Sequence, residues 1–324
     1  MICPSPPASE IIIRSIREAD LAAADHVTRV AFGTATGAPD PQLFFGDMNM
    51  VQNRWRIGGS TVFVAESDRE IVASNVVTRW GSFGFFGPFG VRPDLWDRGI
   101  ARRMMTAVMD QFDLWQVRLA GLYTIPNSPK HIGLYQQFGF KPQYLTAVMT
   151  KHLTVVPDPK SVSNVSIYAD FSRTEHTRSL AECRSLTESI FEGLDVTLEI
   201  EAIEAGRLGD TLLLRNGNEL SGFAACHLGP DTEAGSDTCY VKFAAASGGT
   251  GGEQTFENLL AACEAYAHGK GVSKLTAGVN TSRREAYDIM LGRGFRTDQL
   301  GVAMLKPDIT GFNRPGVFVI DDWR

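Results

Sequence analysis

The fold is decided by the stretch VRPDLWDRGIARRMM, residues 91–105. An apolar, aromatic run typical of a strand leads into it, and Pro93 ends ladder pairing because proline has no N–H to donate. A basic turn follows, and Gly99 leaves the backbone bare where a helical pattern begins. The first N–H groups of a helix lack intrahelical partners and carry partial positive charge. With three arginines nearby, this helix start predicts a pyrophosphate site, the alternative being an ordinary helix start with a solvated basic face.

Two stretches of the chain resemble motifs of the GNAT-type acyl-CoA N-acyltransferases. The sequence WDRGIA, residues 96–101, resembles motif A, written Gln/Arg-x-x-Gly-x-Gly/Ala, although Trp96 stands where the family prefers Gln or Arg. Residues 127–140 resemble motif B, a helix that the family ends with Leu-Tyr-x-x-x-Gly-Phe. The residues that fit this ending are Leu134, Tyr135, Gly139 and Phe140.

The order of predicted elements over residues 10–152 is also that of the family. It runs strand, helix, helix, three meandering strands, helix, strand, helix, strand, with the second helix expected at residues 42–56. A helix between the strands at 81–91 and 118–124 makes these two strands parallel. In the family this pair splays apart and receives the pantetheine arm. A bulge, or a close approach by a ligand, is indicated within residues 81–91 by Gly84, Gly87, Pro88 and Gly90.

The second half of the sequence repeats this plan. Residues 155–164 are rich in proline and serine and predict a linker. We therefore expect an N-terminal GNAT domain at 1–154 and a C-terminal GNAT-like domain with a tail at 165–324. The fold class expected is α+β: two tandem GNAT folds, each a mixed, mostly antiparallel sheet flanked by helices, with a splayed parallel central strand pair.

The two copies differ where chemistry would occur. The second glycine-rich turn, residues 247–253, has no arginine, and Glu253 would repel a phosphate. Met290 fills the position that matches Tyr135. We therefore expect the second copy to be structural or substrate-shaping, without turnover of its own.

Composition restricts the class of protein. The chain has 324 residues, 44% of them hydrophobic, and a net charge of −6, which argues against broad nucleic-acid binding. No apolar run reaches membrane-spanning length, and the start does not resemble a signal peptide. The five cysteines are scattered without metal-ligand spacing, so we expect reduced, mostly packed thiols and no metal. These features favour a cytoplasmic monomer or homodimer that does not bind membranes.

The resemblance implies where coenzyme A would lie. Phe89 and Val91 would offer backbone groups to the pantetheine arm, and the N–H of Val91 would also point at the thioester oxygen. Asn127 stands where the family often places another pantetheine contact. The residues assigned to the diphosphate are Arg98, Gly99, Ile100, Ala101 and Arg102.

Acyl transfer to an amine needs a neutral amine, a stabilised oxyanion and a proton for the departing thiolate. Tyr135 is the expected general acid, because a phenol keeps its proton at neutral pH; a merely packed tyrosine is the alternative. His131, four residues earlier on the same helix face, either assists proton movement or simply packs. No general base is evident, and Glu66, one strand back, and a chain of water molecules are both open candidates.

The function implied is an N-acetyltransferase that moves an acetyl group from acetyl-CoA to a primary amine of a small molecule. One alternative is a non-catalytic acyl-CoA-binding or sensing protein, which Trp96 and the missing base favour. Another is transfer of a longer acyl group. The tail, residues 318–324, mixes apolar and acidic residues. It either packs passively or adds a strand that brings a carboxylate near the cleft between the domains.

Overall fold

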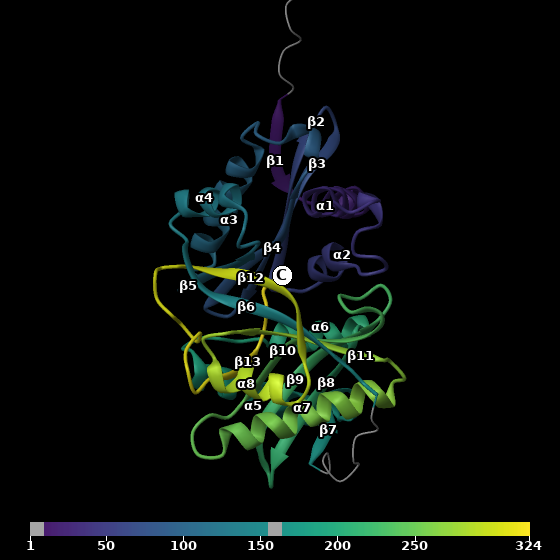
Figure 1. The fold of residues 1–324 in the computed structure, drawn as a ribbon, viewed down its shortest axis with the longest axis vertical. Helices are drawn as coiled ribbons and strands as arrows, with labels where there is room; N and C mark the ends of the chain where they lie inside the picture. Colours follow the sequence, from purple (N-terminus) through teal and green to yellow (C-terminus); the bar gives the residue numbers. More distant parts are fainter. Residues whose placement is uncertain (1–9, 155–163) are drawn as a thin grey trace, which may run out of the picture.

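A computed structural model describes residues 10–154 and 164–324 (Figure 1). Within these residues, thirteen strands form one sheet that runs through both halves of the chain. We call residues 10–154 the N half and residues 164–324 the C half. The N half contains β1 (Ile11–Ser15), α1 (Leu21–Thr36), α2 (Met50–Trp55), β2 (Ser60–Ser67), β3 (Glu70–Trp80), β4 (Phe83–Val91), α3 (Ile100–Leu114), β5 (Leu119–Thr124), α4 (Pro129–Gln137) and β6 (Lys141–His152).

The C half repeats this order. It contains β7 (Val165–Ile167), α5 (Arg173–Ile190), α6 (Thr197–Gly206), β8 (Gly209–Asn216), β9 (Glu219–Gly229), β10 (Gly235–Ala246), α7 (Gly252–Gly269), β11 (Lys274–Asn280), α8 (Arg284–Gly292), β12 (Arg296–Lys306) and β13 (Phe318–Ile320). Its four cysteines are free and buried, as expected. No helix in the described parts of the chain is long and apolar enough to cross a membrane.

In the N half the helices cover both faces of the sheet, with α1 and α2 on one face and α3 and α4 on the other (Figure 1). The methionine-rich side of α3 is core: Met104, Met105 and Val108 are fully buried, and they pack with strand residues on the α3 face. On the opposite face Val27 of α1 and Val51 of α2 pack on β2 and β3.

The central strand pair β4 and β5 is parallel, as predicted, but only over four residues. The pairing begins at Phe83 with Leu119 and ends at Phe86 with Leu122. Directly after Phe86, Gly87 and Pro88 of β4 lie opposite a single residue of β3. This is a β-bulge, and β4 then continues along β3 without β5. The two strands therefore diverge at the bulge.

The glycines of β4 have different roles. Gly87 belongs to the bulge, as predicted. A side chain at Gly84 would meet the Phe112 ring of α3 at 2.7 Å, and one at Gly90 would meet α1 at 3.1 Å. The missing side chains at these two glycines therefore allow helices α3 and α1 to pack closely on β4.

The helix expected at residues 42–56 is shorter than predicted. Only Met50–Trp55 is α-helical, after a 3-10 turn at Pro41–Leu43. Between them the carbonyls of Phe44, Gly46 and Met48 all accept hydrogen bonds from the Arg29 guanidinium of α1. Phe45 and Gly46 in this segment have positive φ angles of +73° and +56°, which a right-handed helix excludes, so α2 begins late.

The strands β6 and β12 are exchanged between the two halves of the sheet. β5 pairs with β12, β11 pairs with β6, and β6 and β12 pair with each other, all antiparallel. The sequence boundary expected at residue 154 thus separates two chain segments whose strands are exchanged. The expected linker at 155–164 lies outside the described residues except for its last residue.

The tail adds a strand to the C half, one of the two outcomes expected for it. β10 and β11 are parallel until Val241 pairs with Ala277, and β10 then bulges at Lys242. Beyond the bulge β13 takes the place of β11 beside β10, with Ala244 opposite Ile320. The tail therefore fills the gap that opens between β10 and β11.

Candidate active site

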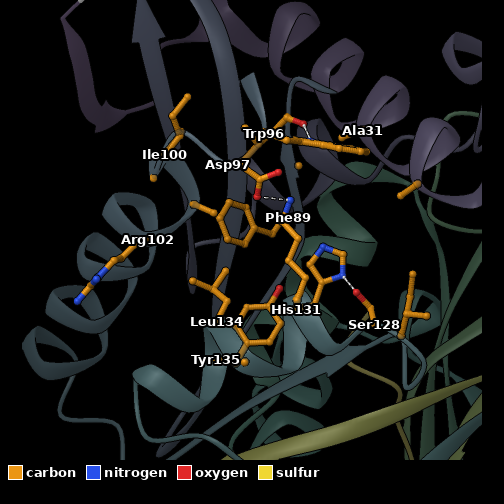
Figure 2. A pocket seen from close by; sticks show the side chains of 18 of the residues that line it. Ala31, Phe89, Trp96, Asp97, Ile100, Arg102, Ser128, His131, Leu134 and Tyr135 are labelled. Atoms are coloured by element: carbon orange, nitrogen blue, oxygen red, sulfur yellow. Dashed lines mark hydrogen bonds and ion pairs between the residues drawn. The ribbon is translucent and has the colours of Figure 1, made fainter. Parts of the chain in front are cut away.

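A cavity of about 630 Å³ lies where β4 and β5 diverge. It is lined from both faces of the sheet: Ala31, Phe32 and Ala35 come from α1, and Leu134 and Tyr135 from α4 (Figure 2). Its volume is typical of a small-molecule site. Because both faces contribute to its wall, the cavity extends through the sheet, and two ligands that enter from opposite faces would meet in it.

The start of α3 forms one part of the cavity wall. Gly99 caps this 15-residue helix with φ +76°, and no atom lies within 4 Å of the position that its side chain would take. Gly99, Ile100 and Ala101 all line the cavity. The unpaired N–H groups of the first helical turn therefore meet open space, which suits an anion.

The arginines predicted for this anion do not all reach it. Arg102 lines the cavity, but its side chain points away from the other labelled side chains (Figure 2), and Arg98 is exposed outside the lining. The ammonium at the cavity belongs to Lys130, which sequence reasoning missed. It lies 2.7 Å from the carboxylate of Asp97 and 5.5 Å from the centre of the Trp96 ring. A lysine at the start of an exposed helix gives no sequence signal for this placement.

The backbone of β4 faces the cavity through Phe89 and Val91. The N–H of Arg92 donates to the Val72 carbonyl at 2.8 Å, and hydrogen-bonding residues alternate along an antiparallel pair. The backbone groups of Gly90 therefore face β3, and those of Phe89 and Val91 face the cavity. Trp96 donates from its indole nitrogen to the Val91 carbonyl at 2.7 Å. This leaves the Val91 N–H available in the cavity.

Tyr135 is buried in the cavity wall. Only 7% of it is exposed, and its ring packs edge-on against Phe86 with the ring centres 5.5 Å apart. Its hydroxyl points into the space between Phe89 and His131 (Figure 2). Burial raises the pKa of the phenol well above its ordinary value, which the Thr124 hydroxyl offsets in part. The side chain is thus a proton donor at neutral pH.

His131 lines the same space, whereas Asn127 is exposed outside the lining. The His131 ring bonds through Nδ1 to the Ser128 hydroxyl at 2.8 Å. Burial, and secondarily the charge of Lys130, lower the pKa of the imidazole. A neutral ring with its second nitrogen unused by Ser128 can carry a proton across the cavity.

Glu66 does not reach the cavity. It lies on β2 beside the edge strand β1, where its carboxylate is 2.6 Å from the Arg14 guanidinium. An acid so placed cannot take a proton from an amine at Tyr135, which removes the geometric basis for Glu66 as general base. Asp97, paired with Lys130, is the one carboxylate among the described residues that line the cavity.

The corresponding place in the C half is filled by the tail. A side chain at Gly252, where α7 begins, would lie 2.6 Å from the Phe318 ring of β13. That ring packs at a tilt against Phe256 of α7, with the ring centres 5.7 Å apart. Met290, which matches Tyr135, is fully buried in the core of this half.

Part of the chain matches a known protein family. Residues 58–142, which span β2 to the start of β6, match the family model described as "Acetyltransferase (GNAT) domain". The fold of the whole chain is similar to that of a protein of Pyrococcus horikoshii, with a TM-score of 0.68, 15% identity and 100% and 98% of the two chains covered.

Two further structures extend the likeness over both halves. A GCN5-related N-acetyltransferase of Sphaerobacter thermophilus gives a TM-score of 0.60 at 16% identity, with 94% and 96% of the chains covered. A tandem GNAT protein from the clavulanic acid biosynthesis pathway gives 0.57 at 13%, with 91% and 98% covered. The predicted fold class, two tandem GNAT folds, is confirmed. No curated protein matches the sequence significantly.

Proposed function

We propose that the N half transfers an acetyl group from acetyl-CoA to a primary amine of a small molecule. The observation that carries the proposal is the cavity that passes through the sheet where β4 and β5 diverge. One end offers the start of α3 to an anion, and Tyr135 lies in the wall. The N–H groups at the start of α3 suit a diphosphate, and the backbone groups of Phe89 and Val91, which face the cavity, suit a chain of amides. The GNAT match of residues 58–142 supports this reading.

Different residues of the cavity serve different steps of the acyl transfer. The N–H of Val91 donates to the carbonyl oxygen on which negative charge develops as the amine nitrogen attacks the acyl carbon. The carbon–sulfur bond then breaks, and Tyr135 gives its phenol proton to the sulfur. His131, neutral at physiological pH, takes the proton that the amine loses and passes it to solvent, and the Tyr135 phenolate regains a proton from solvent before the next turnover.

We further propose that the C half has no turnover of its own. Its gap between β10 and β11 holds β13, its glycine-rich turn carries Glu253, and its helix α8 has Met290 where α4 has Tyr135. Each difference removes one requirement of the reaction: space for the acetyl donor, a favourable electrostatic environment for its phosphates, or the group that donates the proton.

A non-catalytic acyl-CoA-binding protein is the second candidate. It is favoured by Trp96, whose indole N–H already donates a hydrogen bond to the Val91 carbonyl. It is also favoured by the lack of a free carboxylate, which could act as general base, among the described lining residues. Release of free thiol from acetyl-CoA, measured against a panel of primary amines, separates the two candidates. Turnover that is lost in Tyr135→Phe supports the transferase, and cofactor binding without turnover on any amine supports the binding protein.

A further inference from the structure

Three segments far apart in the sequence meet at the guanidinium of Arg54. This α2 residue is 1% exposed. Its Nε and one terminal nitrogen donate to the two carboxylate oxygens of Glu233 at 2.8 and 2.5 Å. Its other terminal nitrogen donates to the Gly87 carbonyl at 2.6 Å, and the Arg324 carbonyl of the tail is also bonded. The N half, the C half and the tail are thereby joined at one group.

The Gly87 carbonyl lies at the point where the cavity opens. Phe86 is the last residue of β4 that pairs with β5, and Gly87 begins the bulge that follows. A carbonyl in a bulge has left the regular ladder, and a buried carbonyl needs another donor. Arg54 supplies that donor from the α1 and α2 face, so β4 is held on that side of the gap.

Glu233 fixes Arg54 from the C half. It lies in the turn between β9 and β10, is 2% exposed, and also binds the Lys242 ammonium at 2.9 Å. Lys242 is the bulge residue of β10. One carboxylate therefore connects the bulge of β10 directly, and the bulge of β4 through Arg54. Burial opposes ionisation of Glu233, but these two cations hold its pKa well below the ordinary value.

The rest of α2 is docked on the same turn. The Asn53 side chain donates to the Asp231 carbonyl at 2.8 Å, and the N–H of Asn49 donates to the Thr232 carbonyl at 2.9 Å. The position of the Arg54 guanidinium is thus set by the C half rather than by its own short helix.

We propose that Arg54 is a positioning residue through which Glu233 of the C half holds the β4 bulge and keeps the cavity open where β4 and β5 diverge. The inference rests on the proposed function for its kinetic consequence. The C half, without turnover of its own, thereby shapes the site in the N half. The position of β4 is measurable without turnover, so the two proposals fail separately.

The chain offers a control for the loss of an arginine that binds a carboxylate with the same geometry. Arg293 binds Glu264 with the same two-pronged geometry, at 3.0 and 2.9 Å, and Lys151 binds that carboxylate at 2.9 Å. Among the described residues, none of these three has a hydrogen bond or ion pair with a side chain of β4. Arg54→Met and Arg293→Met therefore remove ion pairs of the same geometry, in which the arginine side chains are 1% and 26% exposed, and only the first touches the bulge.

The test compares amide hydrogen exchange over residues 86–92 and steady-state kinetics in the two variants. For Arg54→Met we expect exchange at least about tenfold faster, since local opening governs the rate. We also expect a kcat lower by at least about tenfold with the KM for acetyl-CoA within about threefold, the mark of a group that serves the transition state. Arg293→Met should lower the melting temperature but change neither exchange nor kcat, and Arg54→Lys should recover part of the loss.

Wild-type exchange over residues 86–92 in Arg54→Met would overturn the proposal, and so would an equal change in Arg293→Met. If Arg54→Met does not fold, the isosteric Glu233→Gln decides, with faster exchange expected and unchanged exchange contradicting the inference. A wild-type protein with no turnover on any amine would refute the proposed function, whereas the exchange comparison would still decide the role of Arg54.

Discussion

The two halves of the molecule contain the same divergence of parallel strands with different contents. In the N half the space beyond the β4 bulge is a cavity, and in the C half the space beyond the β10 bulge holds β13. The strand in the C half pairs with Ala244–Ala246 by backbone hydrogen bonds, which is how an extended ligand adds to a sheet. The comparison teaches that a binding cleft can be closed by a segment of its own chain while the surrounding fold is preserved.

The largest expected difference concerns the proton donor. Tyr135→Phe should lower kcat by about 10²–10⁴-fold, the usual contribution of a general acid, while affinity for coenzyme A changes little. Thiol release and calorimetric titration measure the two quantities. Met290→Leu is the matched change in the C half, because α4 and α8 end with the same hydrogen bond, from Phe140 to Tyr135 and from Phe295 to Met290. It should leave kcat unaltered, and a Tyr135→Phe variant with near wild-type kcat would refute the assignment.

The strand that fills the C half should matter for stability rather than for binding. Phe318→Ala removes a buried ring and should lower the free energy of unfolding by about 3–5 kcal/mol in denaturant titrations. Tyr144→Ala, at a residue that is 48% exposed, should cost within about 0.5 kcal/mol. Both variants should bind one coenzyme A per chain, as should the wild type. Two bound molecules per chain would show that the C half keeps a working cleft.

A smaller effect is expected at the cavity rim, where Asp97 pairs with Lys130. Asp97→Asn frees the ammonium and removes a negative charge near the start of α3. Because both side chains are largely exposed, affinity for coenzyme A should rise only by about two- to fivefold, and less at high salt. Asp113→Asn, in the last turn of α3, makes the same charge change away from the cavity and should have no effect. Weaker binding in Asp97→Asn would contradict the placement of the phosphates.

The smallest effect concerns His131, whose C-half counterpart by position is Ala286. The lowered pKa of His131 means that the unfolded chain binds its proton first, so stability should fall as pH drops below the unfolded value of about 6.5. Melting temperatures between pH 7.5 and 5.5 should therefore fall slightly more for the wild type than for His131→Gln. Parallel curves for the two proteins would show that the ring titrates normally.

Much of the site was predictable because its signals are local in sequence. Glycines and a proline in one strand indicated the bulge, and the Leu134-Tyr135 and Gly139-Phe140 pairs located the helix that carries the acid. These features depend on backbone conformation at single positions. They can therefore be recognised in the sequence without knowing which residues lie nearby in the fold.

The remaining features depend on partners that a single sequence does not reveal. Arg98 and Lys130 both carry a positive charge, and only the packed structure shows which ammonium or guanidinium reaches the cavity. Glu66 has a carboxylate that could act as a general base, but its strand β2 does not bring it to the cavity. Arg54 lies in a predicted helix without any motif, and its partners are 33 and 179 residues away. Strand exchange is hidden for the same reason, because β6 and β12 both have patterns that fit either half.

The exchanged strands mean that neither half is a separable unit. Residues 1–154 produced alone would carry β6 without β11 or β12 beside it, and β5 would lose its neighbour β12. Open edges of this kind promote aggregation. Conversely, a full-length chain nicked by an engineered protease site within residues 155–163 should elute from a sizing column as one species and separate only in denaturant. A chain that is broken between the halves should therefore fold only when both pieces are produced together.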